Sequence, residues 1–83
     1  MSHRLPIEAG PGVLEDGRRL ALITRRELWL RYLGLGGDAS PGQVEDYLDE
    51  RSAPDRREYN LLVDALNERF SDIASVTRLA YVA

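Results

Sequence analysis

The segment from Thr24 to Leu35, TRRELWLRYLGL, constrains the fold most, because it is too apolar for a helix with one buried side. Successive residues of an α-helix are turned by about 100°, so its leucine and aromatic side chains cover an arc of roughly 220°. A surface helix of a globular domain usually has an apolar stripe little more than about 100° wide. The segment is therefore either central in its own fold or partly covered by a partner.

The composition indicates one small folded domain. The chain has 83 residues, of which 43% are hydrophobic and 30% are charged, and no apolar run approaches the roughly 20 residues that span a bilayer. It contains no cysteine, which excludes disulfides and thiolate metal sites. The first residues lack the apolar centre of a signal peptide. We therefore expect a cytoplasmic protein without a membrane segment.

Capping signals predict the ends of the first two helices. Thr24 and Glu27 match the T-x-x-E capping box, and the glycines within residues 34–37 then end that helix. Ser40 begins an S-P-x-Q pattern that is typical of a second helix start. Because Pro54 disfavours helical geometry in the residue before it, we expect the second helix to end around residues 51–53.

A third, longer helix is predicted after either Asp55 or Ser52, both of which are suitable N-caps. The tail, residues 75–83, is too apolar to be free in solvent. It either extends this helix or returns as a short strand beside residues 20–23. The apolar positions of the third helix follow helical spacing: Tyr59, Leu62, Val63, Leu66, Phe70 and Ile73.

The start of the chain divides into an arm and a possible hairpin. Residues 1–12 contain two prolines and two glycines without apolar periodicity, which predicts a flexible arm before a single helical domain, residues 13–83. Asp16-Gly17 between apolar segments is a strong short-range hairpin signal. The expected fold is therefore mainly α, a three-helix domain, with a short β-hairpin before it as an open alternative.

The sequence contains few residues in patterns typical of enzyme active sites. His3 is the one histidine, and the absence of lysine excludes a phosphate-binding loop of the Walker type. Glu45, Asp46, Asp49 and Glu50 form i, i+4 pairs without a calcium-loop pattern, so they make either a solvated face or a protein-binding face. We therefore predict a protein that is not an enzyme, with no catalytic residue, cofactor or metal ion.

A helix-turn-helix-like DNA-binding transcriptional regulator is the alternative, since three helices with these spacings resemble that motif. Phosphate contacts need clustered basic residues. Residues 1–37 carry six arginines and four acidic residues, whereas residues 38–83 carry five arginines and ten acidic residues. The second and third helices are thus acidic, and nucleic-acid binding would depend on one basic patch: Arg18, Arg19, Arg25, Arg26 and Arg31.

Protein–protein contact is the preferred function. Trp29, Leu30 and Tyr32 are either core residues or interface anchors, because Trp, Tyr and Arg are enriched at binding hot spots. We expect a non-enzymatic regulatory or adaptor protein whose partner is another protein or a second copy in a homodimer. In that dimer, basic residues beside the apolar arc pair with the acidic face of the partner copy: Arg25, Arg26 and Arg31 with Glu45, Asp46, Asp49 or Glu50.

Four short motifs lie within roughly residues 20–70: Arg26-Glu27-Leu28-Trp29-Leu30-Arg31-Tyr32, Leu35-Gly36-Gly37, Val44-Glu45-x-Tyr47-Leu48 and Ala65-Leu66-Asn67-Glu68-Arg69. They resemble a group of short actinobacterial single-domain proteins of unknown function. The resemblance is weaker in the arm and tail. It implies a stand-alone domain from a high-GC genome, and it transfers no site residue.

Overall fold

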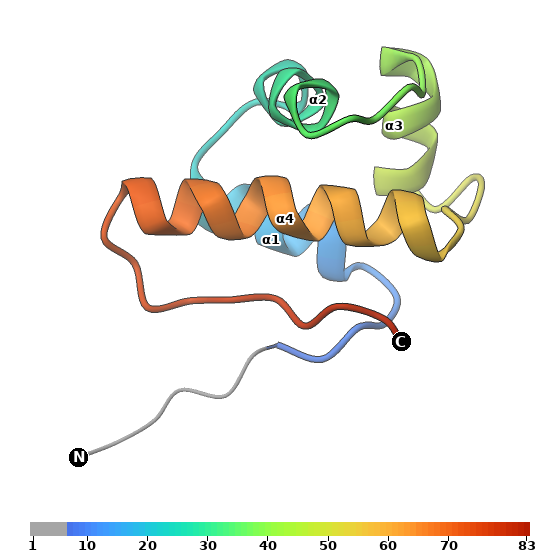
Figure 1. Cartoon of the computed structure of the whole chain (residues 1–83). Coiled ribbons are helices and arrows are strands. Elements are labelled where there is room, and N and C mark those ends of the chain that lie inside the picture. The colour runs from blue at the N-terminus through green and yellow to red at the C-terminus, as the bar shows by residue number, and fades with distance from the viewer. Residues whose placement is uncertain (1–6) are drawn as a thin grey trace.

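The computed structural model describes residues 7–83, and these form four helices connected by short loops (Figure 1). Helix α4 contacts both α1 and α2, and α3 contacts α2 and α1. The expectation of a mainly helical fold is confirmed, but the described chain has one helix more than the three predicted. The helices are α1 Val13–Ala21, α2 Arg25–Gly34, α3 Pro41–Leu48 and α4 Arg56–Asp72.

The predicted β-hairpin is wrong, because its residues form α1. Gly17 lies inside this helix and faces the core, and a Cβ atom there would lie only 2.8 Å from Cδ1 of Leu79. The glycine therefore allows a close approach between α1 and the tail of the chain. Glu15 also pairs with Arg18 and Arg19, three and four residues further on, which favours a helix over a turn.

The predicted helix starts are present in the structure. Thr24 and Glu27 form the reciprocal capping box at α2, with both hydrogen bonds 3.0 Å long. Ser40 caps α3 by accepting the backbone N–H of Gln43 at 3.1 Å. Of the two alternatives for α4, Asp55 is the N-cap.

The core lies between the inner faces of the helices and includes one residue from the tail. On α4, four of the six predicted apolar positions are buried, whereas Tyr59 is partly buried and Ile73 is exposed. The largest fully buried aliphatic side chains come from three helices and the tail: Leu28, Val44, Leu62, Val63, Leu66 and Leu79.

The tail runs along α4 in an extended conformation, so neither predicted alternative for it is correct (Figure 1). Asn67 binds the backbone N–H and C=O of Leu79 at 2.7 and 3.0 Å, and Asn60 binds those of Val82 at 2.8 and 2.9 Å. Asn60 and Asn67 are seven residues apart on the helix, and Leu79 and Val82 are three residues apart in the extended tail. Both separations span about 10 Å, so the two hydrogen-bonded pairs match in spacing. Ile7 forms an isolated parallel bridge with Leu79.

Residues 1–6 of the predicted arm, with His3, lie outside the described residues. Within residues 7–83, no helix has the length and apolar character needed to cross a membrane.

Candidate protein-interaction surface

Helix α2 contacts both α3 and α4, and these two contacts account for part of its wide apolar arc. Leu28 and Tyr32 have no exposed surface, and Trp29 and Leu33 are partly buried against the same core. The fold thus covers part of the apolar arc, and the rest of it remains on the surface.

Tyr32 joins α2, the α2–α3 loop and α4 beneath that surface. Its hydroxyl donates a short hydrogen bond to the buried carboxylate of Glu58 and accepts the backbone N–H groups of Asp38 and Ala39 at 3.1 and 2.8 Å. Burial, and after it the hydrogen bond to Glu58, raises the pKa of Tyr32. Tyr32 is a structural centre of the fold and is not accessible to a partner.

Trp29 and Leu30 occupy more outward positions. The indole Nε1 of Trp29 donates to the carbonyl oxygen of Ala39 at 3.0 Å, which fixes the ring at the edge of the core. Leu30 is 48% exposed. Arg26, Leu30 and Leu33 follow helical spacing on the side of α2 that faces away from Leu28. We call Arg26, Trp29, Leu30 and Leu33 the outer surface of α2.

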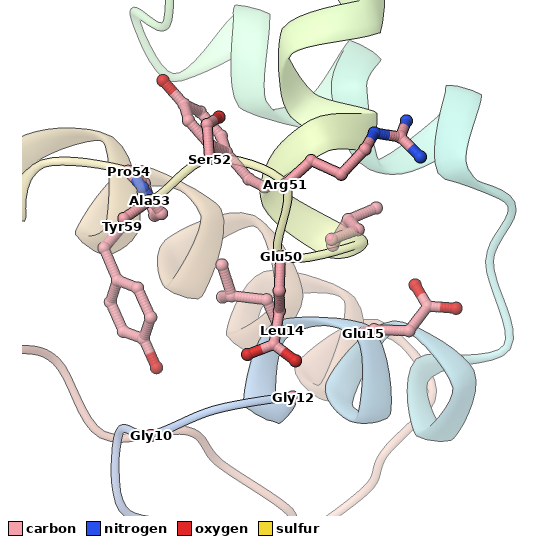
Figure 2. A pocket seen from close by; sticks show the side chains of 12 residues that line it. Gly10, Gly12, Leu14, Glu15, Glu50, Arg51, Ser52, Ala53, Pro54 and Tyr59 are labelled. Atoms are coloured by element: carbon pink, nitrogen blue, oxygen red, sulfur yellow. The ribbon is translucent and has the colours of Figure 1, made fainter.

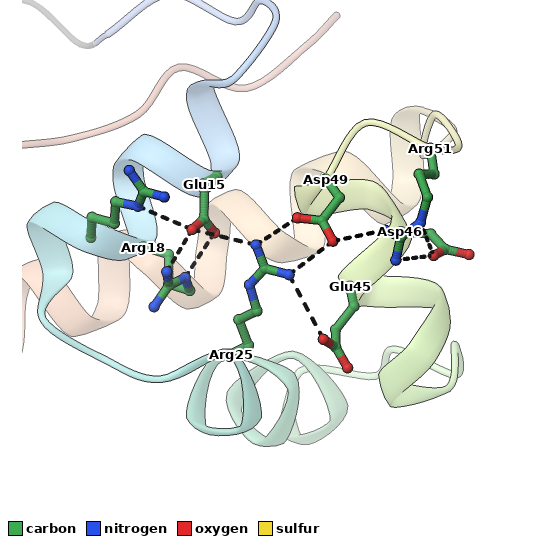
Figure 3. A network of polar contacts seen from close by, with 8 residues as sticks. Glu15, Arg18, Arg25, Glu45, Asp46, Asp49 and Arg51 are labelled. Atoms are coloured by element: carbon green, nitrogen blue, oxygen red, sulfur yellow. Dashed lines mark hydrogen bonds and ion pairs between the residues drawn. The ribbon is translucent and has the colours of Figure 1, made fainter.

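Arg25 belongs to an ion-pair network within the chain (Figure 3). Its two terminal nitrogens bind Asp49 at 2.7 and 3.1 Å, and Nη2 also lies 3.5 Å from Oε2 of Glu15. The hydrogen bond from Arg25 holds the pKa of Asp49 below its ordinary value, and that from Arg18 does the same for Glu15. This network links α2 to α1 and α3.

Arg31 connects α2 to the other neighbouring helix. Its guanidinium binds Glu68 at 2.9 Å and Asp72 at 2.8 Å, both on α4. Arg25 and Arg31 thus have acidic partners in their own chain, whereas Arg26 is exposed and forms no ion pair with any residue from 7 to 83.

The four acidic residues predicted to face a partner have different surroundings. Asp46 and Asp49 pair with Arg51 at 2.9 and 3.2 Å. Glu45 has a half-exposed side chain whose closest cation, Arg25, is 3.7 Å away. Glu50 is exposed and forms no ion pair within the described chain. Glu45 and Glu50 are therefore the two members with carboxylates still available to a partner.

No role was assigned to Glu58 from the sequence. The structure buries its carboxylate beside the hydroxyl of Tyr32, with Arg57 at 3.0 Å. Helical spacing along α4 carries a usable signal, because Glu58 lies four residues before Leu62 on the buried face.

The described residues contain no group of three or more side chains suited to hold a metal ion. The chain shows no significant similarity to any protein-family model, curated protein or solved structure with which it was compared. The resemblance to short actinobacterial proteins therefore stays a prediction.

Proposed function

We propose that this protein is a non-enzymatic regulatory or adaptor protein that acts through protein–protein contacts made by the outer surface of α2. The observation that carries the proposal is Leu30, which is 48% exposed beside the partly buried Trp29 and Leu33. An apolar patch joined to a buried core is a frequent feature of binding surfaces.

The charges around this patch favour a second copy of the chain as the partner. Arg26 lies on the patch without an acidic partner among the described residues, and Glu45 has a half-exposed side chain whose closest cation, Arg25, is 3.7 Å away. In a two-fold dimer each Arg26 would meet an acidic residue of the other copy, and each outer surface would cover the other. Such peripheral pairs set orientation and association rate more than affinity.

Sedimentation equilibrium across a concentration series tests this proposal. Leu30→Ser is the informative variant, because half of its side chain is already in solvent and the fold should persist. Loss of a hot-spot side chain costs more than about 1 kcal/mol, so we expect the dimer dissociation constant to rise by roughly tenfold.

Leu20→Ser is the matched control, since Leu20 is 55% exposed on α1. We expect this variant to dimerise like the parent and both variants to melt near the parent temperature. A parent protein that remains monomeric at high concentration would contradict self-association. Equal weakening by both substitutions would contradict the assignment to α2.

The arrangement of charge counts against the DNA-binding alternative. Helix α3 carries no basic residue, and it presents Glu45 and Asp46 instead. A DNA-binding protein would also lose affinity steeply as salt rises, whereas a contact centred on Leu30 should depend little on salt.

A further inference from the structure

A pocket of about 380 Å³ opens on a part of the molecule that shares no residue with the outer surface of α2 (Figure 2). It lies between the start of α1, the end of α3, the loop of residues 50–54 and the first turns of α4. Leu14, Leu48 and Pro54 provide apolar walls, and the backbone at Gly10 and Gly12 closes one side. Pockets of this volume hold small organic ligands.

Tyr59 gives the pocket an unsatisfied polar group. Its hydroxyl oxygen is buried and has no hydrogen-bond partner in the described part of the protein. Burial raises the pKa of Tyr59 by more than the adjacent backbone of Gly10 lowers it, so the hydroxyl is protonated at neutral pH and can donate or accept a hydrogen bond. A buried polar atom without a partner is costly, which is why few proteins retain one without a reason.

Glu50 supplies a negative charge at the same pocket. Glu50 follows the C-cap of α3 in the left-handed conformation, with φ of 61°, which is a common way for a helix to end. Figure 2 shows its carboxylate directed from the loop toward Gly12 and Leu14.

The other charged groups that line the pocket are already neutralised. Glu15 pairs with Arg18 and Arg25, and Arg51 pairs with Asp46. In Figure 2 the guanidinium of Arg51 points away from Tyr59. The uncompensated charge of the lining is therefore negative, and it belongs to Glu50.

We propose that this pocket binds a small organic cation, an amine with an apolar body. The ammonium group donates hydrogen bonds to the carboxylate of Glu50 and to the hydroxyl oxygen of Tyr59, and the apolar body packs on Leu14, Leu48 and Pro54. Charge selects the cation, because a carboxylate binds an ammonium through a charge-assisted hydrogen bond that is stronger than one to a neutral group of equal shape.

The test is a titration of the full chain with benzylamine, followed by two-dimensional amide NMR, with benzyl alcohol and benzoate as probes of matched shape. We expect benzylamine to shift the amide signals of Gly10, Gly12 and Ser52. The expected dissociation constant is about 1 mM. Benzyl alcohol and benzoate should bind at least about tenfold more weakly, the usual effect of losing one charged hydrogen bond.

Two variants identify the contributing groups. Glu50→Gln and Tyr59→Phe should each weaken benzylamine binding by about tenfold. Tyr59→Phe should also melt at or above the parent temperature, because it removes a buried hydroxyl that has no partner. Tyr81→Phe is the control, since the Tyr81 hydroxyl binds Asp64 outside the pocket and its loss should leave binding unchanged.

Three results would overturn the proposal: no shift with millimolar benzylamine, equal binding of all three probes, or parent-like binding by both pocket variants. Dimer formation is measured separately, by sedimentation equilibrium, so either proposal can fail while the other stands.

Discussion

Gly37→Ala should destabilise this protein severely although it adds a single methyl group. Gly37 follows α2 and donates its backbone N–H to the carbonyl oxygen of Tyr32 at 3.0 Å. Its φ is outside the left-handed region, so alanine is acceptable to the backbone itself. The obstacle is steric, because an added Cβ would lie far inside van der Waals contact of three ring carbons of Tyr32: Cζ, Cε1 and Cε2.

The size of the effect follows from how firmly the ring is held. Tyr32 has no exposed surface, and its hydroxyl is fixed by Glu58 and by two backbone N–H groups. Either the ring moves and these hydrogen bonds break, or the loop moves away from α2. Overpacking a core costs about 1–3 kcal/mol, and the lost hydrogen bonds place the expected cost at the upper end, about 3 kcal/mol. In a domain of this size that lowers the melting temperature by about 12–24 °C.

Thermal unfolding followed by circular dichroism measures the change, and Gly34→Ala is the matched control. Gly34 is helical, exposed and has no other side chain or distant backbone within 4 Å of an added Cβ. Alanine there should stabilise the helix by up to about 1 kcal/mol, because it lowers the backbone entropy of the unfolded chain. A Gly37→Ala protein that melts within about 2 °C of the parent would refute the steric reasoning.

Helix starts were predictable because their chemistry is local. The capping box of Thr24 and Glu27 and the caps at Ser40 and Asp55 use atoms within three residues of each other, so a short stretch of sequence contains the whole interaction. The second half of the expected pattern at Ser40 is absent, because the side chain of Gln43 binds Ser52 instead.

Helix α1 was predictable only in part, because one of the contacts that favour it involves a residue distant in the sequence. Asp16-Gly17 suits a tight turn when considered alone, but Gly17 also allows Leu79 and Leu66 to approach the helix closely. Those residues are brought together only when the tail folds back along α4. The pairing of Glu15 with Arg18 was visible in the sequence and favoured the helix.

For a similar reason, the sequence could not show which part of the apolar arc of α2 reaches the surface. The width of the apolar arc was clear, but the number of helices that cover it was not. The fold buries Tyr32 and uses Arg25 and Arg31 in intrachain ion pairs. Leu30 and Arg26 remain on the surface, which reduces the predicted interface to its outermost members.

The Ser40 cap, the Leu66 core position and the Arg25 ion pairs each allow a simple test. Ser40→Ala removes the acceptor for a backbone N–H 3.1 Å away and should cost about 1 kcal/mol in a urea titration. Leu66→Ala empties a fully buried position and should cost about 2–5 kcal/mol, so a melting temperature near that of the parent would contradict the assigned core. The last test concerns pH, because the pKa values of Glu15 and Asp49 lie below their ordinary values of 4.5 and 3.8. Groups with a depressed pKa in the folded state stabilise it fully above those ordinary values, and the contribution is lost as pH falls through the folded-state pKa. Urea titrations from about pH 7 to about pH 3 should therefore show falling stability below about pH 4.5, with a shallower fall in Arg25→Met, because Asp49 then loses the hydrogen bond that depresses its pKa. If the parent and this variant lost stability in parallel, the Arg25–Asp49 pair would not be the origin of the acid sensitivity.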